Sequence, residues 1–152
     1  MSKQVGDGEC WTLANEALKA IASECQSQRQ EACVPSQGVV HGYLLYSYLP
    51  PRPCNPPGGV VAAGVARGDI IQFVSGHFKH ANGGQSWAGA PDHTAVVTKV
   101  ERDGVLQVVE QNSGGVKKVK VSSYNFKELV AGEVRIFRAI GERWLGPLEA
   151  SW

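Results

Sequence analysis

The sequence lacks the features that mark membrane, secreted and nucleic-acid-binding proteins. None of its apolar runs approaches the ~20 residues that a membrane-spanning helix needs. Residues 1–8 carry no apolar stretch of the kind found in signal peptides. The 15 lysines and arginines are matched by 14 acidic residues, so no basic excess exists to neutralise phosphates. We therefore expect a cytoplasmic protein that binds no nucleic acid and crosses no membrane; a secreted protein whose leader has been removed would look the same.

Cysteine is scarce, and its spacing does not fit a metal site. The four cysteines stand at positions 10, 25, 33 and 54, and none belongs to a Cys-x-x-Cys or Cys-x-x-His pair of the kind that holds zinc. His77 and His80 lie close together, but two histidines without a third ligand favour a surface loop. We expect neither a metal nor an organic cofactor. The state of Cys25, Cys33 and Cys54 stays open, because reduced thiols suit a cytoplasmic chain but a Cys33–Cys54 disulfide is compatible with the sequence.

The chain contains enough apolar material for one core. Hydrophobic residues make up 43% of the 152 residues and charged residues 19%, a balance typical of a globular domain. We expect a single domain over residues 1–152, with its core at about 5–140. The 18 glycines and 8 prolines indicate short strands joined by long connections. Residues 26–65 show no clear pattern: 39–49 fit either a second helix or a buried hairpin, and the proline-rich 50–57 is expected to be extended.

One helix is predicted near the start of the chain. Apolar residues at 10, 13, 14, 17, 18 and 21 follow the spacing of a single buried helical stripe. Gly6 and Gly8 supply a tight turn before it, and Asp7 is a candidate N-cap. Cys10 therefore falls in the first helical turn.

The second half of the chain has the alternation that strands require. Strands are predicted at 69–74, 93–100, 105–110, 116–121 and 134–139. A glycine-rich loop, 75–92, separates the first two, and Asp103-Gly104 is a hairpin turn between the next two. Residues 122–129 are expected to form a short capped turn of helix with Gly132 at its end. A helix followed by such strands predicts an α+β fold, in which the N-terminal helix packs on an antiparallel β-sheet.

Four polar residues on this skeleton form a candidate catalytic site. Cys10 stands at a helix N-terminus, where free N–H groups and the helix dipole favour a thiolate. The hairpin brings together His93, which opens one strand, and Glu110, which closes the other, with Asn112 two residues later. A thiol, an imidazole and a group that orients the imidazole are the parts of a thiol hydrolase. Each residue alone is more often structural, but their joint order favours the catalytic interpretation.

The segments that carry these residues resemble the CHAP and NlpC/P60 branch of the papain-like superfamily. They are Gly-Asp-Gly-Glu-Cys-Trp-Thr-Leu-Ala at 6–14, Gly-Asp-Ile-Ile-Gln-Phe at 68–73, Asp-His-Thr-Ala-Val-Val at 92–97 and Glu-Gln-Asn at 110–112. The amino-acid sequences of these segments are most similar to those of a eukaryotic subgroup. This subgroup includes the papain-like domain of plant hydroxyproline-rich-type proteins and the C-terminal domain of fungal actin-patch adaptors that bind myosin tails.

The resemblance implies a papain-like fold and a role for each residue of the site. Cys10 resembles the nucleophile, His93 the general base, Glu110 the partner of the imidazole, and Asn112 an accessory polar residue. Neighbouring side chains are expected to bind the substrate: Trp11, Trp87, Asp92 and Gln111.

Three functions are compatible with these residues. The first is a cysteine peptidase or amidase that cleaves amide bonds through a Cys-His-Glu triad and a thioester intermediate. The second is a catalytically inactive papain-like module that binds a protein partner, of the actin-cortex adaptor type. The third, with less support, is a secreted peptidoglycan amidase or endopeptidase. We expect a monomer that takes a peptide or amide substrate, or a protein partner.

Overall fold

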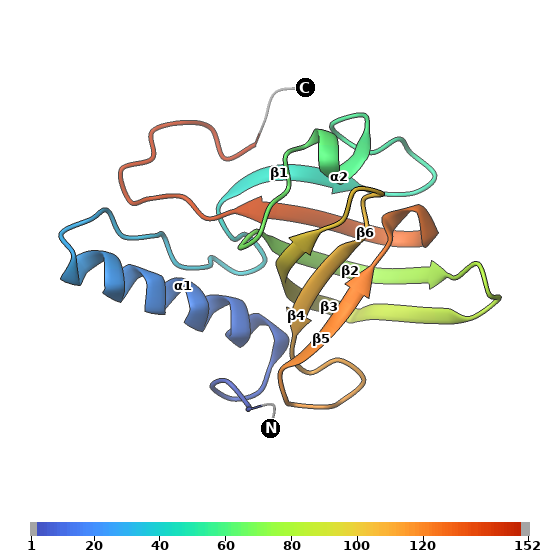
Figure 1. Cartoon of the computed structure of the whole chain (residues 1–152), viewed down its shortest axis with the longest axis horizontal. Coiled ribbons are helices and arrows are strands. Elements are labelled where there is room, and N and C mark those ends of the chain that lie inside the picture. Colours follow the sequence, from blue (N-terminus) through green and yellow to red (C-terminus); the bar gives the residue numbers. More distant parts are fainter. Residues whose placement is uncertain (1–2, 150–152) are drawn as a thin grey trace.

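A long helix beside one antiparallel sheet makes up the computed structural model, which describes residues 3–149 (Figure 1). The long helix is α1 (Cys10–Ser27), and the strands are β1 (Tyr43–Tyr48), β2 (Ile70–Lys79), β3 (Gln85–Val100), β4 (Leu106–Glu110), β5 (Lys120–Tyr124) and β6 (Leu129–Arg138). A short helix α2 (Gly59–Ala62) and a 3-10 turn η1 (Phe126–Glu128) lie in the connections. None of the helices in this part of the chain is long and apolar enough to span a membrane. The α+β fold predicted from the sequence is confirmed.

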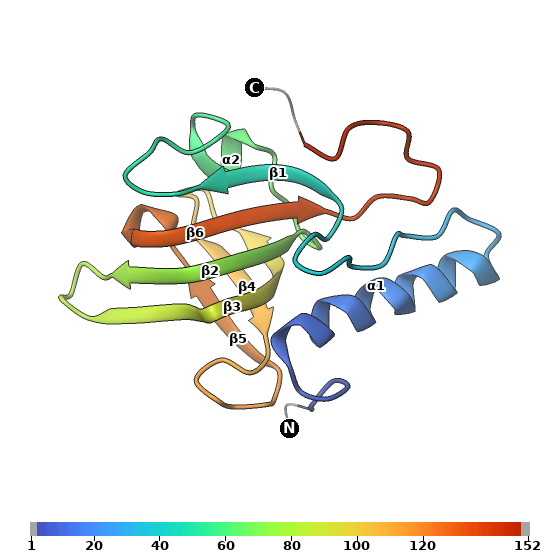
Figure 2. The ribbon, with the colours of Figure 1, turned by 180° about the vertical axis from the view of Figure 1, so that it is seen from behind.

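The six strands lie in the order β1-β6-β2-β3-β4-β5, and every neighbouring pair is antiparallel. Two opposite views show the sheet bending, so that β4 and β5 cross the direction of β1, β6 and β2 steeply (Figures 1 and 2). The last strand of the chain, β6, lies between β1 and β2. The centre of the sheet therefore joins residues that are far apart in the sequence.

The bend wraps the sheet around an apolar core. The largest fully buried apolar side chains in it are Phe73, Phe78, Ile71, Leu106, Ile136, Val97, Val108 and Val134. A smaller cluster lies under α1, where Ala14 and Leu18 pack with Ile70. Burying a side chain the size of leucine stabilises a fold by ~1.5–3 kcal/mol. This packing fixes α1 against the sheet and thereby sets the position of its first residue.

The glycine-rich segment 75–92 is not a loop, and the prediction for it was wrong. β2 and β3 continue through this segment and the chain turns only at residues 80–84. Phe78 and Ala88 face the core and are almost fully buried. Glycine and serine weaken a strand locally, but the burial of Phe78 and the pairing of β2 with strands on both sides outweigh that preference.

Residues 26–65 contain one strand and one short helix. Within the segment 39–49 only β1 forms, a single strand paired with β6, instead of the predicted second helix or buried hairpin. The proline-rich 50–57 is not extended as predicted but turns back on β1. Ser47 and Asn55 exchange two backbone hydrogen bonds of 2.8 Å each. Proline fixes φ at a value that suits turns, so the same residues are compatible with either outcome.

The region before β6 was predicted in part. A short helical turn does form there as η1, and the Asn125 side chain caps it by accepting a hydrogen bond from the N–H of Lys127. Gly132, however, does not end a helix but lies inside β6 with φ of +82°. A side-chain carbon at this position would collide with the carbonyl oxygen of Ser75. Glycine is therefore needed here for the close approach of two backbones.

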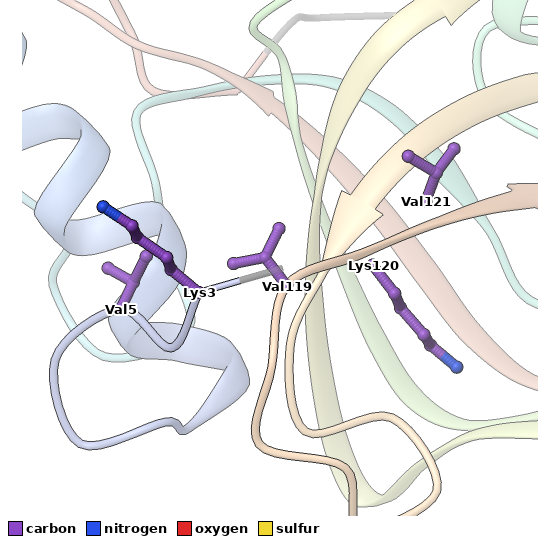
Figure 3. A pocket seen from close by; sticks show the side chains of 5 residues that line it. All are labelled: Lys3, Val5, Val119, Lys120 and Val121. Carbon is purple, nitrogen blue, oxygen red and sulfur yellow. The ribbon is translucent and has the colours of Figure 1, made fainter. Parts of the chain in front are cut away.

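The N-terminal segment is held against the start of β5. The N–H of Val119 donates to the carbonyl oxygen of Lys3 at 3.1 Å. With Val5, Lys120 and Val121 these residues line a shallow hollow, in which the Lys120 side chain leads away from Lys3 (Figure 3). This contact fixes the residues that lead into α1.

Candidate active site

Cys10 is the first residue of α1, as the sequence predicted. The predicted N-cap is wrong, because Glu9 holds that position and makes no side-chain capping bond. Asp7 instead closes the preceding turn: its carboxylate accepts from the N–H of Glu9 at 3.0 Å and from the hydroxyl of Thr12 at 2.6 Å. The first N–H groups of the helix are thus not taken by a capping side chain. They favour negative charge at the nearby sulfur.

His93 lies on β3 beside the end of β4. The pairing of Ala95 with Glu110 brings the two side chains together. Nε2 of His93 lies 2.8 Å from Oε2 of Glu110, which leaves Nδ1 as the ring nitrogen for the thiol. Phe73 packs against the ring, with centroids 6.1 Å apart and planes inclined by 24°. The imidazole is therefore held in one orientation.

Glu110 is held by three further side chains, all on β5. Its carboxylate accepts hydrogen bonds from the hydroxyls of Ser122 at 2.6 Å and Tyr124 at 2.7 Å. Nζ of Lys120 lies 3.4 Å from the same carboxylate. Sequence reasoning missed these three partners. The signal was present, because alternate residues of the strand paired with β4 face the same side of the sheet as Glu110.

The Cys10 thiol interacts with the His93 ring and with the backbone N–H groups of Thr94 and Trp11. Burial by itself raises the pKa of this thiol, because a charge is disfavoured away from water. The hydrogen bonds from His93 and Thr94 and the positive charge of His93 outweigh burial. The pKa of Cys10 therefore lies below its ordinary value of 9.0.

The pKa of His93 is raised and the pKa of Glu110 is lowered, so that each shift favours the charged form of its group. Burial lowers the pKa of His93, but its hydrogen bonds with Cys10 and Glu110 and their negative charges raise it to about 9. Burial raises the pKa of Glu110, but hydrogen bonds from His93, Ser122 and Tyr124 lower it to about 2. At neutral pH His93 is therefore an imidazolium and Glu110 a carboxylate, and the imidazolium shifts the Cys10 thiol toward its thiolate.

The thiol and the imidazole open onto a cleft of about 430 Å³. Glu110 is almost fully buried behind them. The cleft lies between the β2–β3 hairpin and the connection after β4, and its lining consists of Glu9, Cys10, Trp87, Ala88, Gly89, Ala90, Asp92, His93, Asn112, Ser113, Gly114 and Gly115. A ligand in this cleft would therefore lie against the sulfur.

Two of the four predicted substrate-binding residues line the cleft, whereas Trp11 and Gln111 do not. Trp87 and Asp92 are part of its lining. The Trp87 side chain is 67% exposed and stacks on His77, with ring centroids 4.9 Å apart. Trp11 is turned to other contacts, since its ring N–H donates to the carbonyl oxygen of Gly38 at 2.6 Å.

Gln111 and Asn112 hold the residues before α1 and do not contact the imidazole. Gln111 is fully buried; its amide accepts from the N–H of Val5 at 2.8 Å and donates to the carbonyl oxygens of Val5 at 2.9 Å and Glu9 at 3.0 Å. Asn112 donates to the carboxylate of Glu9 at 2.6 Å, and Lys117 pairs with the same carboxylate. Gln111 therefore lies outside the cleft in which it was predicted to bind substrate, whereas Asn112 lies in the cleft lining and holds the residue before Cys10.

The remaining cysteines and histidines take other roles. All four cysteines are free thiols, so no Cys33–Cys54 disulfide is present. Nδ1 of His80 lies 2.7 Å from the carboxylate of Glu128. Within residues 3–149, no three His, Cys, Asp or Glu side chains gather closely enough to hold a metal ion.

A thiol at a helix N-terminus, facing an imidazole and a carboxylate on a following antiparallel sheet, defines the class of papain-like, cysteine proteinase-fold proteins. Comparison with known families agrees with this class. The family model described as "AIM3/BBC1 Cysteine proteinase-fold domain" matches residues 1–149. The chain belongs to this family, and the predicted papain-like relationship to the eukaryotic adaptor subgroup is confirmed.

Two curated relatives are similar to nearly the whole chain. Altered inheritance of mitochondria protein 3 of Debaryomyces hansenii is 33% identical over 156 residues, which cover 97% of this chain and 15% of the relative. The SH3 domain-containing protein C23A1.17 of Schizosaccharomyces pombe is 26% identical over 151 residues, covering 93% of this chain and 8% of the relative. The chain thus spans only a small part of either relative. No solved structure matches it.

Proposed function

We propose that this chain is a protein-binding module of the adaptor type and that a segment of its partner occupies the cleft beside Cys10. The observation that carries the proposal is the setting of the shared domain, which makes up 15% of one relative and 8% of the other. The name of the second relative records an SH3 domain, a class of domain that binds proline-rich peptides. The resemblance of this sequence to the C-terminal domain of fungal actin-patch adaptors supports the same function. On this proposal the chain acts in the cytoplasm as a single domain and a monomer, with the CHAP and NlpC/P60 type of papain-like fold.

The cleft suits an extended polypeptide. Its volume of about 430 Å³ falls in the range of ligand sites. The glycine-containing walls at 88–90 and 113–115 leave backbone groups accessible to a bound chain. Trp87 offers a large exposed aromatic face, the type of side chain that most often anchors an interface. On this proposal Trp87 contacts an apolar side chain of the partner, and Asp92 contacts a polar or cationic group beside it.

A cysteine peptidase or amidase is the second candidate, and the complete Cys10–His93–Glu110 triad favours it. The Cys10 thiolate would attack the carbonyl carbon of an amide, and the electron pair of the C=O bond would move to the oxygen beside the backbone N–H of Cys10. The His93 imidazolium would give its proton to the leaving nitrogen as the C–N bond breaks, and a thioester would remain. Water, deprotonated by His93, would release the acid and restore the ion pair. Glu110 would hold the ring throughout.

A peptide library derived from a proteome distinguishes the two candidates when native chain and Cys10→Ala are compared. Binding predicts that both retain the same peptides and that mass spectrometry finds no new termini. Hydrolysis predicts new termini with the native chain and none with Cys10→Ala. Trp87→Ala should weaken peptide retention, whereas Trp144→Ala, another exposed tryptophan away from the cleft, should not. Failure of the native chain to retain any peptide would contradict the binding proposal.

The third candidate, peptidoglycan cleavage, is supported by fewer observations. Both relatives are fungal proteins, and the described cleft has no feature that favours a cell-wall glycopeptide over another amide. Zymography on purified peptidoglycan tests it: a zone of clearing that Cys10→Ala abolishes would reinstate this function.

A further inference from the structure

A second hollow, which we call the proline groove, lies at the far end of the sheet from Cys10. Its volume is about 740 Å³, and its apolar walls come from Tyr46, Tyr48, Pro51, Pro53, Pro57, Val60, Val61 and Phe126. The turn between β3 and β4 borders it, whereas the triad residue Glu110 closes the opposite end of β4. Both views place α2 near the top of the molecule and the first turn of α1 near the bottom (Figures 1 and 2). The proline groove is therefore separate from the candidate active site.

The walls of the proline groove are held in place by the fold. Tyr46 is buried and stacks on Phe126, with centroids 5.9 Å apart and planes inclined by 15°. The proline-rich segment is tied back to β1 by the paired backbone bonds of Ser47 and Asn55. Prolines have few accessible conformations, so a ligand would find this wall already formed and would order little on binding.

The floor of the proline groove is accessible as well as apolar. Val61 on α2 is 53% exposed although it lines the hollow. Val60, from the same turn of helix, lies against the turn that contains Gly104. Aromatic rings set beside proline form the kind of surface that binds extended, proline-containing peptides.

Three cations line the groove: Arg52, Arg102 and Lys127. One acid, Asp103, lines it with them, and its carboxylate accepts the N–H of Val105. Within the described part of the chain none of the three cations forms an ion pair; Nζ of Lys127 bonds to a backbone oxygen at 3.3 Å. The groove thus carries three cations against one carboxylate, and this excess of positive charge steers and orients an acidic partner.

We propose that the proline groove binds an extended acidic segment of a protein partner, with a proline or aliphatic residue of that segment on the apolar floor. The unpaired cations attract the acidic residues on either side of the segment's centre. The aromatic and proline walls contact the proline or aliphatic residue at its centre. A peptide fits better than a nucleic acid, because the floor is apolar and the chain as a whole carries a net charge of only +1. This surface is additional to the cleft at Cys10 and does not depend on it.

A display library of extended peptides tests the proposal. The library carries a central proline or aliphatic residue flanked by acidic, neutral or basic residues. We expect selection of acidic flanks on the native chain, and about tenfold weaker binding of the selected peptides to Arg102→Glu, Lys127→Glu and Val61→Asp, as for the loss of complementary charges or an apolar anchor at an interface. Amide shift changes in the native chain should map to the residues around Tyr46 and Phe126.

Matched variants outside the groove control for general effects of charge and exposure. Lys79→Glu changes an exposed lysine on the β2–β3 hairpin, and Val116→Asp changes a valine that is 52% exposed in the connection before β5. Both should bind the selected peptides like the native chain, as should Cys10→Ala. Selection of basic or neutral flanks, no selection at all, or equal binding by groove variants and native chain would overturn the proposal. The proposal would also be overturned if a single-stranded oligonucleotide bound the native chain and this binding were lost in the same three groove variants. Loss of binding in Cys10→Ala alone would instead assign the peptides to the cleft.

Discussion

Replacing Glu110 by glutamine tests the electrostatics of the site in a single step. The substitution Glu110→Gln keeps the size of the side chain and one acceptor oxygen, but it removes the charge that faces His93. The pKa of His93, about 9 in the native fold, should then fall toward or below its ordinary 6.5, because burial disfavours the imidazolium. Without the imidazolium, the thiolate of Cys10 loses its main stabilising partner.

The size of the effect follows from the fraction of thiolate. A thiol with the ordinary pKa of 9.0 is about 1% ionised at neutral pH, so the loss of ionisation is limited to about a hundredfold. A thiolate of higher pKa is a stronger nucleophile, which returns part of this loss. We therefore expect the alkylation rate of Cys10 at neutral pH to fall by about tenfold or somewhat more.

Iodoacetamide labelling, located by mass spectrometry, measures this rate directly. Cys25, Cys33 and Cys54 report in the same molecule on any general change in accessibility. Glu128→Gln is the matched control, because Glu128 also pairs with a histidine at 2.7 Å but lies outside the cleft. An unchanged rate for Cys10 in Glu110→Gln, or an equal fall in the control, would refute the reasoning.

Three further predictions concern stability. Because the pKa of Glu110 is about 2 when folded and 4.5 ordinarily, its charge stabilises the fold above pH 4.5 by about 3 kcal/mol, and this contribution is lost as the pH falls toward 2. In urea unfolding, the difference in free energy of unfolding between the native chain and Glu110→Gln should shrink as the pH falls over that range. A difference that stays constant would contradict this prediction. Asp69→Asn weakens contacts of 2.9 and 2.8 Å with Arg138 and should lower the free energy of unfolding by about 1–3 kcal/mol; no change would mean that this ion pair contributes nothing. Gly132→Ala should lower the free energy of unfolding by about 1–3 kcal/mol in the same assay, because the alanine would be strained at positive φ and its side chain would collide with the backbone of Ser75. Gly38→Ala, also at positive φ but in open space, is its control, and equal costs would contradict the collision.

The helix and the hairpin of the candidate site were predictable because their signals are local. An apolar stripe placed Cys10 at the start of a helix, and a two-residue turn at 103–104 placed His93 opposite the end of the next strand. Both expectations needed only neighbouring residues and the geometry of a tight turn. Local signals were therefore enough to predict which three side chains form the core of the candidate site.

Other features depend on contacts that no local pattern records. The hairpin at 75–92 is extended because Phe78 is buried in the core and β2 pairs with β6, which comes from a distant part of the chain. Gln111 was expected at the substrate, but the N-terminal segment covers it and takes its hydrogen bonds. The proline groove exists because the segment 50–57 folds back beside the turn between β3 and β4. In each case tertiary packing decides between conformations that the sequence alone allows.

The pH dependence of Cys10 alkylation tests the central claim, that a protonated His93 lowers the pKa of this thiol and so favours its thiolate. The native chain would be labelled with iodoacetamide from mildly acidic to mildly alkaline pH, with Cys25, Cys33 and Cys54 as references. The rate for Cys10 should level off at a lower pH than the rate for Cys33, whose pKa is raised by burial. A Cys10 rate that climbs in step with that of Cys33 would contradict the account.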